Sequence, residues 1–168
     1  ATAIIKALFP NAANQAAHNV NWQRVAVALA ARSYCAIITG GPGTGKTTTV
    51  LKLLALLQAL QLTQGLGPLH IKLAAPTGKA AARLNASIAS NLQQQVFPTN
   101  DHFDGEQLKA AIPTEVSTLH RLLGPIANSR QFRHHATNPI GADVVVIDEA
   151  SMVDLEMMAN LVQALDKH

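Results

Sequence analysis

Short apolar runs alternate along this chain with longer segments in which apolar residues recur at helical spacing. Three of the short runs predict strands that are buried on both faces: Cys35–Thr39, His70–Ala75 and Asp143–Ile147. Because helical segments separate these runs, the pattern favours an α/β fold, in which helices cover both faces of a parallel sheet. Three strands make a narrow sheet, so we expect a truncated one.

The predicted helices differ in how much of their surface is apolar. Thr47–Leu60 is apolar on nearly every side, which predicts a buried helix. Lys79–Leu92 and Thr118–Leu123 are predicted as further helical segments. An earlier helix is expected to begin after Asn21, its N-cap. The apolar face predicted for that earlier helix consists of Trp22, Val25, Ala26, Leu29 and Ala30.

A closing helix is predicted from about Met152, and polar or glycine-rich segments connect the elements. Gln61–Pro68 is expected to be a loop, and Gly124–Gly141 a loop or a hairpin. The stretch from Gln93 to Pro113 has no clear pattern. The buried stripe predicted for the closing helix consists of Leu155, Met158, Leu161, Val162 and Leu165.

Composition narrows the class of protein. The 168 residues have the length of about one domain. Cys35 is the only cysteine, so an internal disulfide is impossible, and we expect a cytoplasmic protein in which this thiol is a buried small hydrophobe. No apolar run reaches the roughly 20 residues that span a bilayer. The net charge of +3 is compatible with nucleic-acid binding but does not require it.

The segment Gly40–Thr47 matches the phosphate-binding pattern G-x-x-x-x-G-K-[ST], between a predicted strand and a predicted helix. Glycines let consecutive N–H groups approach phosphate oxygens, and the helix N-terminus adds partial positive charge. Lys46 is expected to neutralise the β- and γ-phosphates of ATP, and the Thr47 hydroxyl to ligate Mg²⁺. The predicted nucleotide-binding residues are Gly41, Pro42, Gly43, Thr44, Gly45, Lys46, Thr47 and, more weakly, Thr48.

Two carboxylates, Asp148 and Glu149, follow the last predicted strand and would therefore lie at the carboxyl edge of the sheet. Asp148 can hold Mg²⁺ through water, and Glu149 can orient or deprotonate the attacking water. The alternative is a strand followed by an acidic helix N-terminus. Ser151 could cap the closing helix or couple the nucleotide site to a neighbouring surface.

The order of these motifs resembles superfamily 1 DNA helicases of the RecD type, the family of exodeoxyribonuclease V alpha subunits. Ala75–Leu84 resembles the family's motif Ia, Ser117–Gly124 its next DNA-side motif, and Asp148–Met152 its motif II. The resemblance implies a single RecA-like P-loop ATPase domain over residues 1–168, the first motor domain of a longer protein. It also implies a motor that moves 5′→3′ on single-stranded DNA in double-strand break repair and recombination.

The resemblance assigns further residues. Gln23 would contact adenine, and Thr77, Lys79, Thr118 and His120 would face the DNA backbone. A hydroxyl, a bare backbone N–H and an ammonium at Thr77–Lys79 suit phosphates. The alternatives are a solvated helix residue for Gln23, a first-turn helix charge for Lys79 and a buried histidine for His120.

The family implies partners: the beta and gamma subunits of exodeoxyribonuclease V. It also implies that a second motor domain supplies a catalytic arginine, so we expect this chain alone to turn over little ATP. Two other functions stay open at the level of residues, a P-loop phosphotransferase on a small molecule and a noncatalytic nucleotide-binding adaptor. The basic cluster Arg130, Arg133, His134 and His135 is either a solvated loop or a DNA or partner contact.

Overall fold

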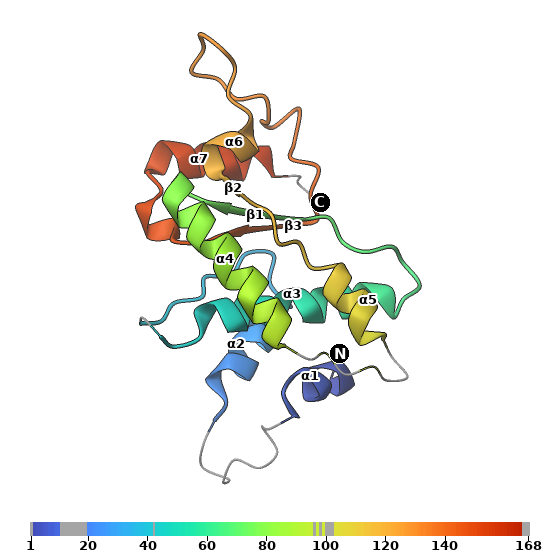
Figure 1. The fold of residues 1–168 in the computed structure, drawn as a ribbon. Coiled ribbons are helices and arrows are strands. Elements are labelled where there is room, and N and C mark those ends of the chain that lie inside the picture. Colours follow the sequence, from blue (N-terminus) through green and yellow to red (C-terminus); the bar gives the residue numbers. More distant parts are fainter. Residues whose placement is uncertain are drawn as a thin grey trace. The chain divides into compact units, whose positions relative to one another are not determined.

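A computed structural model describes residues 2–10, 20–41, 43–95, 97, 99 and 103–165 of the chain (Figure 1). The chain forms two compact units. Ala1–Leu69 and Ile88–Ile112 make up the first, which we call the helical unit. His70–Ser87 and Pro113–His168 make up the second, which we call the sheet unit. Helix α4 (Gly78–Gln94) contributes residues to both.

Helix α3 (Lys46–Leu62) is the centre of the helical unit. It packs against α1 (Thr2–Leu8), α2 (Trp22–Ala30) and α5 (Gly105–Ala110). Leucine and alanine side chains on several sides of α3 are fully or almost fully buried, namely Leu51, Leu54, Ala55, Leu56 and Ala59. The prediction of a buried helix from its all-round apolar sequence is therefore confirmed.

One polar side chain is completely buried in α3. The amide of Gln58 donates to the carbonyls of Leu69, at 3.0 Å, and Ala111, at 2.8 Å, and accepts from the Leu69 N–H at 2.8 Å. These bonds join α3 to the segments before β1 and after α5. A buried amide is tolerated when its donors and acceptors are satisfied in this way.

Helix α2 begins as predicted, but its buried face differs. The Asn21 side chain accepts from the Arg24 N–H at 2.9 Å, which confirms the N-cap. Val27 is fully buried, whereas Trp22 and Leu29 are 73% and 64% exposed. Trp22 and Leu29 are seven residues apart and therefore share one side of the helix, and α3 covers a different side. The predicted apolar face was wrong for these two residues.

The strand predicted at Cys35–Thr39 does not form. No strand is assigned to this run, and Cys35 is exposed, with Ile37 87% exposed. A buried parallel strand needs backbone partners on its neighbours, and within the helical unit the structure describes no strand that could pair with this run. The expected burial of Cys35 was therefore also wrong.

The sheet unit contains three parallel strands in the order β2-β1-β3. They are β1 (Ile71–Ala75), β2 (Val116–Thr118) and β3 (Val144–Ile147). Strands β1 and β3 were predicted, whereas β2 occupies residues whose last member, Thr118, had been expected to be helical. Figure 1 shows helices beside these strands, and the predicted α/β class with a parallel sheet is confirmed.

Helices pack around this sheet in two clusters. The start of α4 contributes Ala80 and Ala81, which pack with Ala75 and Val116. Helices α6 (Leu119–Leu123) and α7 (Leu155–Ala164) form the other cluster with β3. The residues of this second cluster that are most buried are Leu119, Leu123, Ile140, Leu161 and Ala164.

Helix α7 buries only part of its predicted stripe. Leu161 is buried, but Leu155 and Val162 are 85% and 58% exposed. Because these two are seven residues apart, they lie on one side of the helix, away from the α6 cluster. Asp154 caps α7 by accepting from the Met157 N–H at 2.7 Å. The interpretation of Ser151 as the cap was wrong, since it lies exposed in the 3-10 turn Ala150–Met152.

For the segment Gly124–Gly141, the structure supports the predicted hairpin rather than a plain loop. Isolated antiparallel bridges join Pro125 to Phe132 and His135 to Asn138.

The longest described helices are α3 and α4, with 17 residues each. Neither these nor any other described helix combines the length and apolarity of a membrane span.

Candidate functional site

The loop before α3 adopts a conformation that depends on its glycines. Gly43 and Gly45 have φ of 75° and 79°, in the left-handed region that favours glycine. The Thr44 hydroxyl donates to the Gly41 carbonyl at 2.8 Å and closes the turn. This geometry leaves the loop exposed at the first turn of a long helix, where backbone N–H groups can receive an anion.

Lys46 is the first residue of α3, and its ammonium lies against the same loop. Its Nζ donates to the carbonyls of Gly40, at 2.7 Å, and Gly41, at 2.9 Å. The lysine therefore places a full positive charge beside the partial positive charge of the helix N-terminus. Both charges favour a phosphate at this position.

The two threonines after Lys46 have different surroundings. Thr47 is partly buried in the first turn of α3. The Thr48 hydroxyl donates to Asn91 Oδ1 of α4 at 3.1 Å. No local pattern pointed to Asn91, because 43 positions separate it from Thr48. Because the Thr48 hydroxyl already makes this bond, the backbone N–H of Thr48 is better suited than its hydroxyl to a phosphate.

Helix α2 brings Gln23 to the loop. Its Nε2 donates to the Thr44 carbonyl at 3.3 Å, and a Cβ on Gly45 would lie 2.5 Å from the same nitrogen. The helical unit thus brings Gln23 together with Gly41, Gly43, Thr44, Gly45 and Lys46. Pro42 lies outside the described residues, and the contact between Gln23 and adenine stays a prediction.

In the sheet unit, the carboxyl ends of all three strands are level. Ala75 is in register with Thr118, and Ala74 with Ile147. The Asp148 N–H continues the ladder by donating to the Ala74 carbonyl at 3.0 Å. Residues that follow the three strands therefore share one edge, where parallel sheets place their ligands. Thr77, Thr118 and Asp148 all lie at this edge.

The segment from Thr77 to Lys79 begins α4 and is exposed. The Thr77 hydroxyl oxygen accepts from the Ala80 N–H at 3.1 Å, and its carbonyl accepts from the Ala81 N–H at 2.9 Å. No atom lies within 4 Å of a Cβ built on Gly78, so a ligand can approach the backbone there. Lys79 adds a positive charge in the same turn.

Strand β2, next to β1, also ends at a threonine whose side chain caps a helix. The Thr118 side chain accepts from the Arg121 N–H at 3.2 Å and caps α6. His120 is exposed, which excludes the alternative of a buried histidine. Its ring meets Phe132 edge to face, with 5.4 Å between the centroids. This contact orients the imidazole without enclosing it.

The two carboxylates after β3 differ in exposure and backbone geometry. Asp148 is partly buried, and Glu149 is exposed. Glu149 has φ 50° and ψ 39°, a left-handed conformation that costs a residue other than glycine about 1–2 kcal/mol. Such conformations concentrate at functional sites, where they aim a side chain that the regular strand would direct elsewhere.

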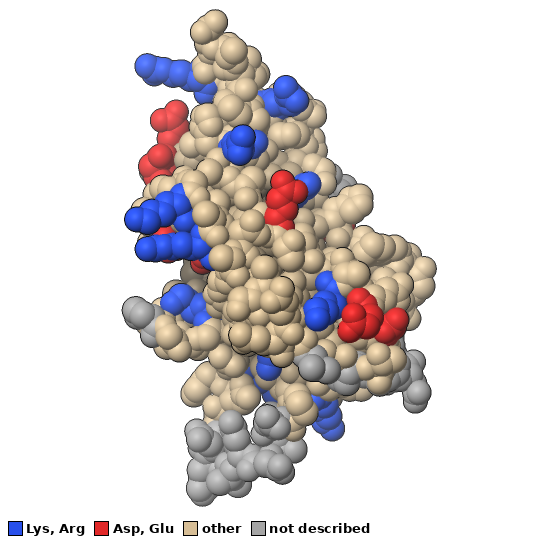
Figure 2. All heavy atoms as spheres, viewed as in Figure 1, with Lys and Arg blue, Asp and Glu red and all other residues tan. Residues whose placement is uncertain are grey.

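Exposed positive charge lies in the helices that follow β1 and β2. Lys79, Arg83 and Arg121 are all exposed. Figure 2 shows more Lys and Arg than Asp and Glu over the beginning of α4 and over α6. This charge balance favours an anionic ligand.

The predicted residues thus fall into two groups, each in its own unit. The phosphate loop belongs to the helical unit, and Thr77, Lys79, Thr118, His120, Asp148 and Glu149 belong to the sheet unit. Within the described part of the chain, no cluster of three or more His, Cys, Asp or Glu is arranged to hold a metal ion. Nucleotide-bound Mg²⁺ needs fewer protein ligands, since phosphates and water supply the rest.

Comparison with known proteins identifies relatives across most of the chain. A family model described as AAA domain matches residues 23–168. The chain is 51% identical over 148 residues to the RecBCD enzyme subunit RecD of Haemophilus influenzae. The aligned region covers 86% of this chain and 22% of the relative. It is 45% identical over 144 residues to the same subunit of Mycolicibacterium smegmatis, covering 85% of this chain and 24% of the relative.

A more distant relative is the ATP-dependent RecD2 DNA helicase of Deinococcus radiodurans, 33% identical over 129 residues, or 77% of this chain and 13% of the relative. The resemblance to the RecD type is therefore confirmed. The chain spans about a quarter or less of the length of these relatives.

Proposed function

Because this chain belongs to the AAA domain family, we propose that it binds ATP with Mg²⁺ and couples ATP hydrolysis to movement along single-stranded DNA. The observation that carries this proposal is the glycine loop closed around the Lys46 ammonium at the N-terminus of α3. The relatives support it, because they are named as RecD subunits and a RecD2 DNA helicase.

In this proposal the helical unit holds the triphosphate. Lys46 moves its ammonium from the loop carbonyls to the β- and γ-phosphates, and the backbone N–H groups of Gly41 and of Gly43 to Thr48 surround them. Gln23, already bonded to the loop at Thr44, contacts the adenine. The bound nucleotide replaces bonds that the ammonium now makes within the loop.

The sheet unit supplies the hydrolytic groups. Asp148 offers a carboxylate oxygen, and Thr47, which belongs to the helical unit, offers a hydroxyl; both are hard ligands of the kind that Mg²⁺ prefers. Bound Mg²⁺ neutralises phosphate charge. Glu149, turned out of the strand direction by its left-handed backbone, orients or deprotonates the attacking water.

The same edge of the sheet supplies part of the DNA track. Thr77 and Thr118 use their hydroxyl oxygens as helix caps, so each hydroxyl proton can be donated to a phosphate oxygen. Lys79 and His120 add exposed donors beside them. These contacts are to the DNA backbone and therefore carry no sequence preference.

At the level of the whole protein, we propose a 5′→3′ DNA helicase subunit of exodeoxyribonuclease V, which acts in double-strand break repair and recombination in the cytoplasm. Residues 1–168 would form its first, RecA-like motor domain, and its partners would be the beta and gamma subunits. The relatives named as RecBCD subunits support this assignment. They give no support to a phosphotransferase that acts on a small molecule.

The DNA-binding part of the proposal is tested by the salt dependence of binding. Lys79→Ala is expected to weaken binding of an oligothymidylate and to lower the slope of log affinity against log salt by about 0.7, one phosphate contact on a single strand. Lys72→Ala is the matched control, because Lys72 is also exposed but is the second residue of β1, before the carboxyl end of the strand. Equal slopes in wild type and Lys79→Ala would contradict the proposal.

The nucleotide part is tested separately. Lys46→Ala is expected to abolish binding of a fluorescent ATP analogue while it leaves oligothymidylate binding in place, since its ammonium lies in the helical unit. Wild-type nucleotide affinity in this variant would exclude the proposed phosphate site.

A further inference from the structure

The first turn of α3 begins without a side-chain cap. Gly45 is the N-cap residue, with φ 79° and ψ 29°, and a glycine has no side-chain acceptor for the N–H groups of the turn. The first intrahelical bond runs from the Thr49 N–H to the Gly45 carbonyl at 2.9 Å. The N–H groups of Lys46, Thr47 and Thr48 precede this bond, and such groups have no acceptor within their helix. The proposed nucleotide site uses them, so its geometry depends on the contacts that hold this turn.

Two threonine hydroxyls of α3 hold the turn in different ways. The Thr49 hydroxyl bonds within the turn, because it donates to the Gly45 carbonyl at 2.9 Å. The Thr48 hydroxyl instead donates to Asn91 Oδ1 of α4 at 3.1 Å, 43 positions along the chain. This second bond ties the turn to another helix rather than to itself.

Asn91 offers a fixed acceptor for that bond. It lies near the end of α4, in the part of this helix that belongs to the helical unit. Its neighbours Ile88 and Leu92 are only 1% and 5% exposed, so this part of α4 is anchored in apolar packing. Asparagine favours a helix less than alanine does, so the helix itself does not explain this residue.

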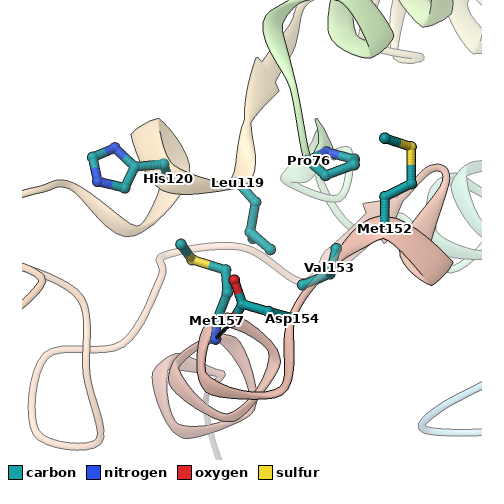
Figure 3. A pocket seen from close by; sticks show the side chains of 7 residues that line it. All are labelled: Pro76, Leu119, His120, Met152, Val153, Asp154 and Met157. Carbon is teal, nitrogen blue, oxygen red and sulfur yellow. Dashed lines mark hydrogen bonds between the residues drawn. The ribbon is translucent and has the colours of Figure 1, made fainter.

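A different side-chain acceptor, in the sheet unit, has a local explanation. Figure 3 shows a pocket in which the Met157 N–H donates to the Asp154 carboxylate, at 2.7 Å. That bond caps α7, and the acceptor is the residue that directly precedes the helix. Asn91 lies within α4 and accepts from a side chain of α3, so its bond with Thr48 is not a cap.

We propose that Asn91 is a positioning residue of the phosphate loop, which holds Thr48 so that its backbone N–H is directed at the α-phosphate of the nucleotide. The inference rests on the proposed nucleotide binding and adds to it a residue from outside the loop. A hydroxyl has one proton to donate, and Thr48 donates it to Asn91. Thr48 therefore serves the nucleotide through its N–H, and Asn91 acts through Thr48.

The test measures binding of the fluorescent ATP analogue, with Mg²⁺, to this chain and its variants. Asn91→Ala and Thr48→Val are each expected to weaken binding about fivefold, the effect of one hydrogen bond. The double variant should also be about fivefold weaker, rather than about twenty-five-fold, because both changes remove the same bond. Thr48→Ser keeps the hydroxyl and should bind as tightly as wild type.

Asn85→Ala is the matched control, because it makes the same change at an exposed position of the same helix. It should have wild-type affinity for the analogue. Alanine raises helix propensity at both positions, which offsets the lost bond in Asn91→Ala and keeps its thermal melting temperature close to that of wild type. A role confined to stability would instead lower the melting temperature of Asn91→Ala and leave its affinity unchanged.

The outcomes separate this inference from the proposed function. Wild-type affinity in Asn91→Ala would overturn the inference and leave nucleotide binding standing. Tighter binding in Asn91→Ala would also overturn it, since Asn91 would then compete with the nucleotide for the Thr48 hydroxyl. Multiplied losses in the double variant would overturn it as well, because the two residues would act independently. If wild type does not bind the analogue, the proposed function fails, and the inference fails with it.

Discussion

Glu149 shows how a functional residue is held at a cost in stability. The strand β3 directs its side chains alternately to the two faces of the sheet, and Asp148 still follows the ladder by bonding Ala74. Glu149 leaves the ladder with φ 50°. A residue other than glycine adopts this conformation only where the surrounding structure imposes it, which agrees with a role for its carboxylate.

The cost of this conformation predicts an unusual order of stability. Glu149→Gly is expected to be more stable than Glu149→Ala by about 1 kcal/mol, because both lose the carboxylate and only glycine relieves the positive φ. Urea unfolding followed by circular dichroism measures the difference. At Glu156, in the first turn of α7, the same pair should show the reverse order, because alanine favours a helix. Equal stability of both Glu149 variants would mean that the conformation is unstrained.

Local signals predicted several residues correctly and missed others for identifiable reasons. The loop glycines and the Asn21 cap follow from chemistry within a few residues of each. The choice between Ser151 and Asp154 as the cap depends on where the 3-10 turn ends, and both have capping side chains. The positive φ of Glu149 depends on the turn that follows β3, and its residue type gives no indication of it.

At the scale of elements, Thr77 combines two roles that one substitution can separate. Its hydroxyl caps α4, and in the proposed function it also contacts a phosphate. Thr77→Asp is expected to keep or slightly raise stability, because aspartate is a good N-cap at a helix N-terminus. The same change should weaken oligothymidylate binding at least several-fold, because its negative charge repels the phosphates.

Thr77→Ser is the control for this prediction, since it retains both the cap and the hydroxyl donor. It should match wild type in thermal melting temperature and in DNA affinity. If Thr77→Asp binds oligothymidylate as tightly as Thr77→Ser, Thr77 does not face the DNA backbone.

The elements differ in how far the sequence predicts them. The helix α3 is long and apolar all round, so its type and burial follow from its own residues. The three-residue strand β2 exists because β1 offers a hydrogen-bonding partner at Leu73 to Ala75, which no local pattern shows. The run Cys35–Thr39 is the converse case, because it has the composition of a strand but forms none. In α2 and α7 the helices were predicted, but which side is buried depends on the neighbouring element.

At the scale of the whole molecule, the proposed ATPase depends on both units. The helical unit contributes Lys46 and Thr47, and the sheet unit contributes Asp148 and Glu149. The proposed function requires that both sets of residues act on the same nucleotide. A common site requires that one bound nucleotide stabilise both units, since a ligand stabilises every part of the native state that it contacts.

Hydrogen exchange tests this requirement. In Mg²⁺ and a slowly hydrolysed ATP analogue at about a hundred times its Kd, amides of Gly43–Thr48 and of Val144–Glu149 should exchange up to about a hundredfold more slowly. Asp148→Ala should keep the protection at the loop and lose it at the end of β3, because only the ligand from the sheet unit is removed. Lys46→Ala should lose protection in both segments. Protection of the loop alone in wild type would contradict the common site, since the carboxylates after β3 would then act apart from the nucleotide that the loop binds.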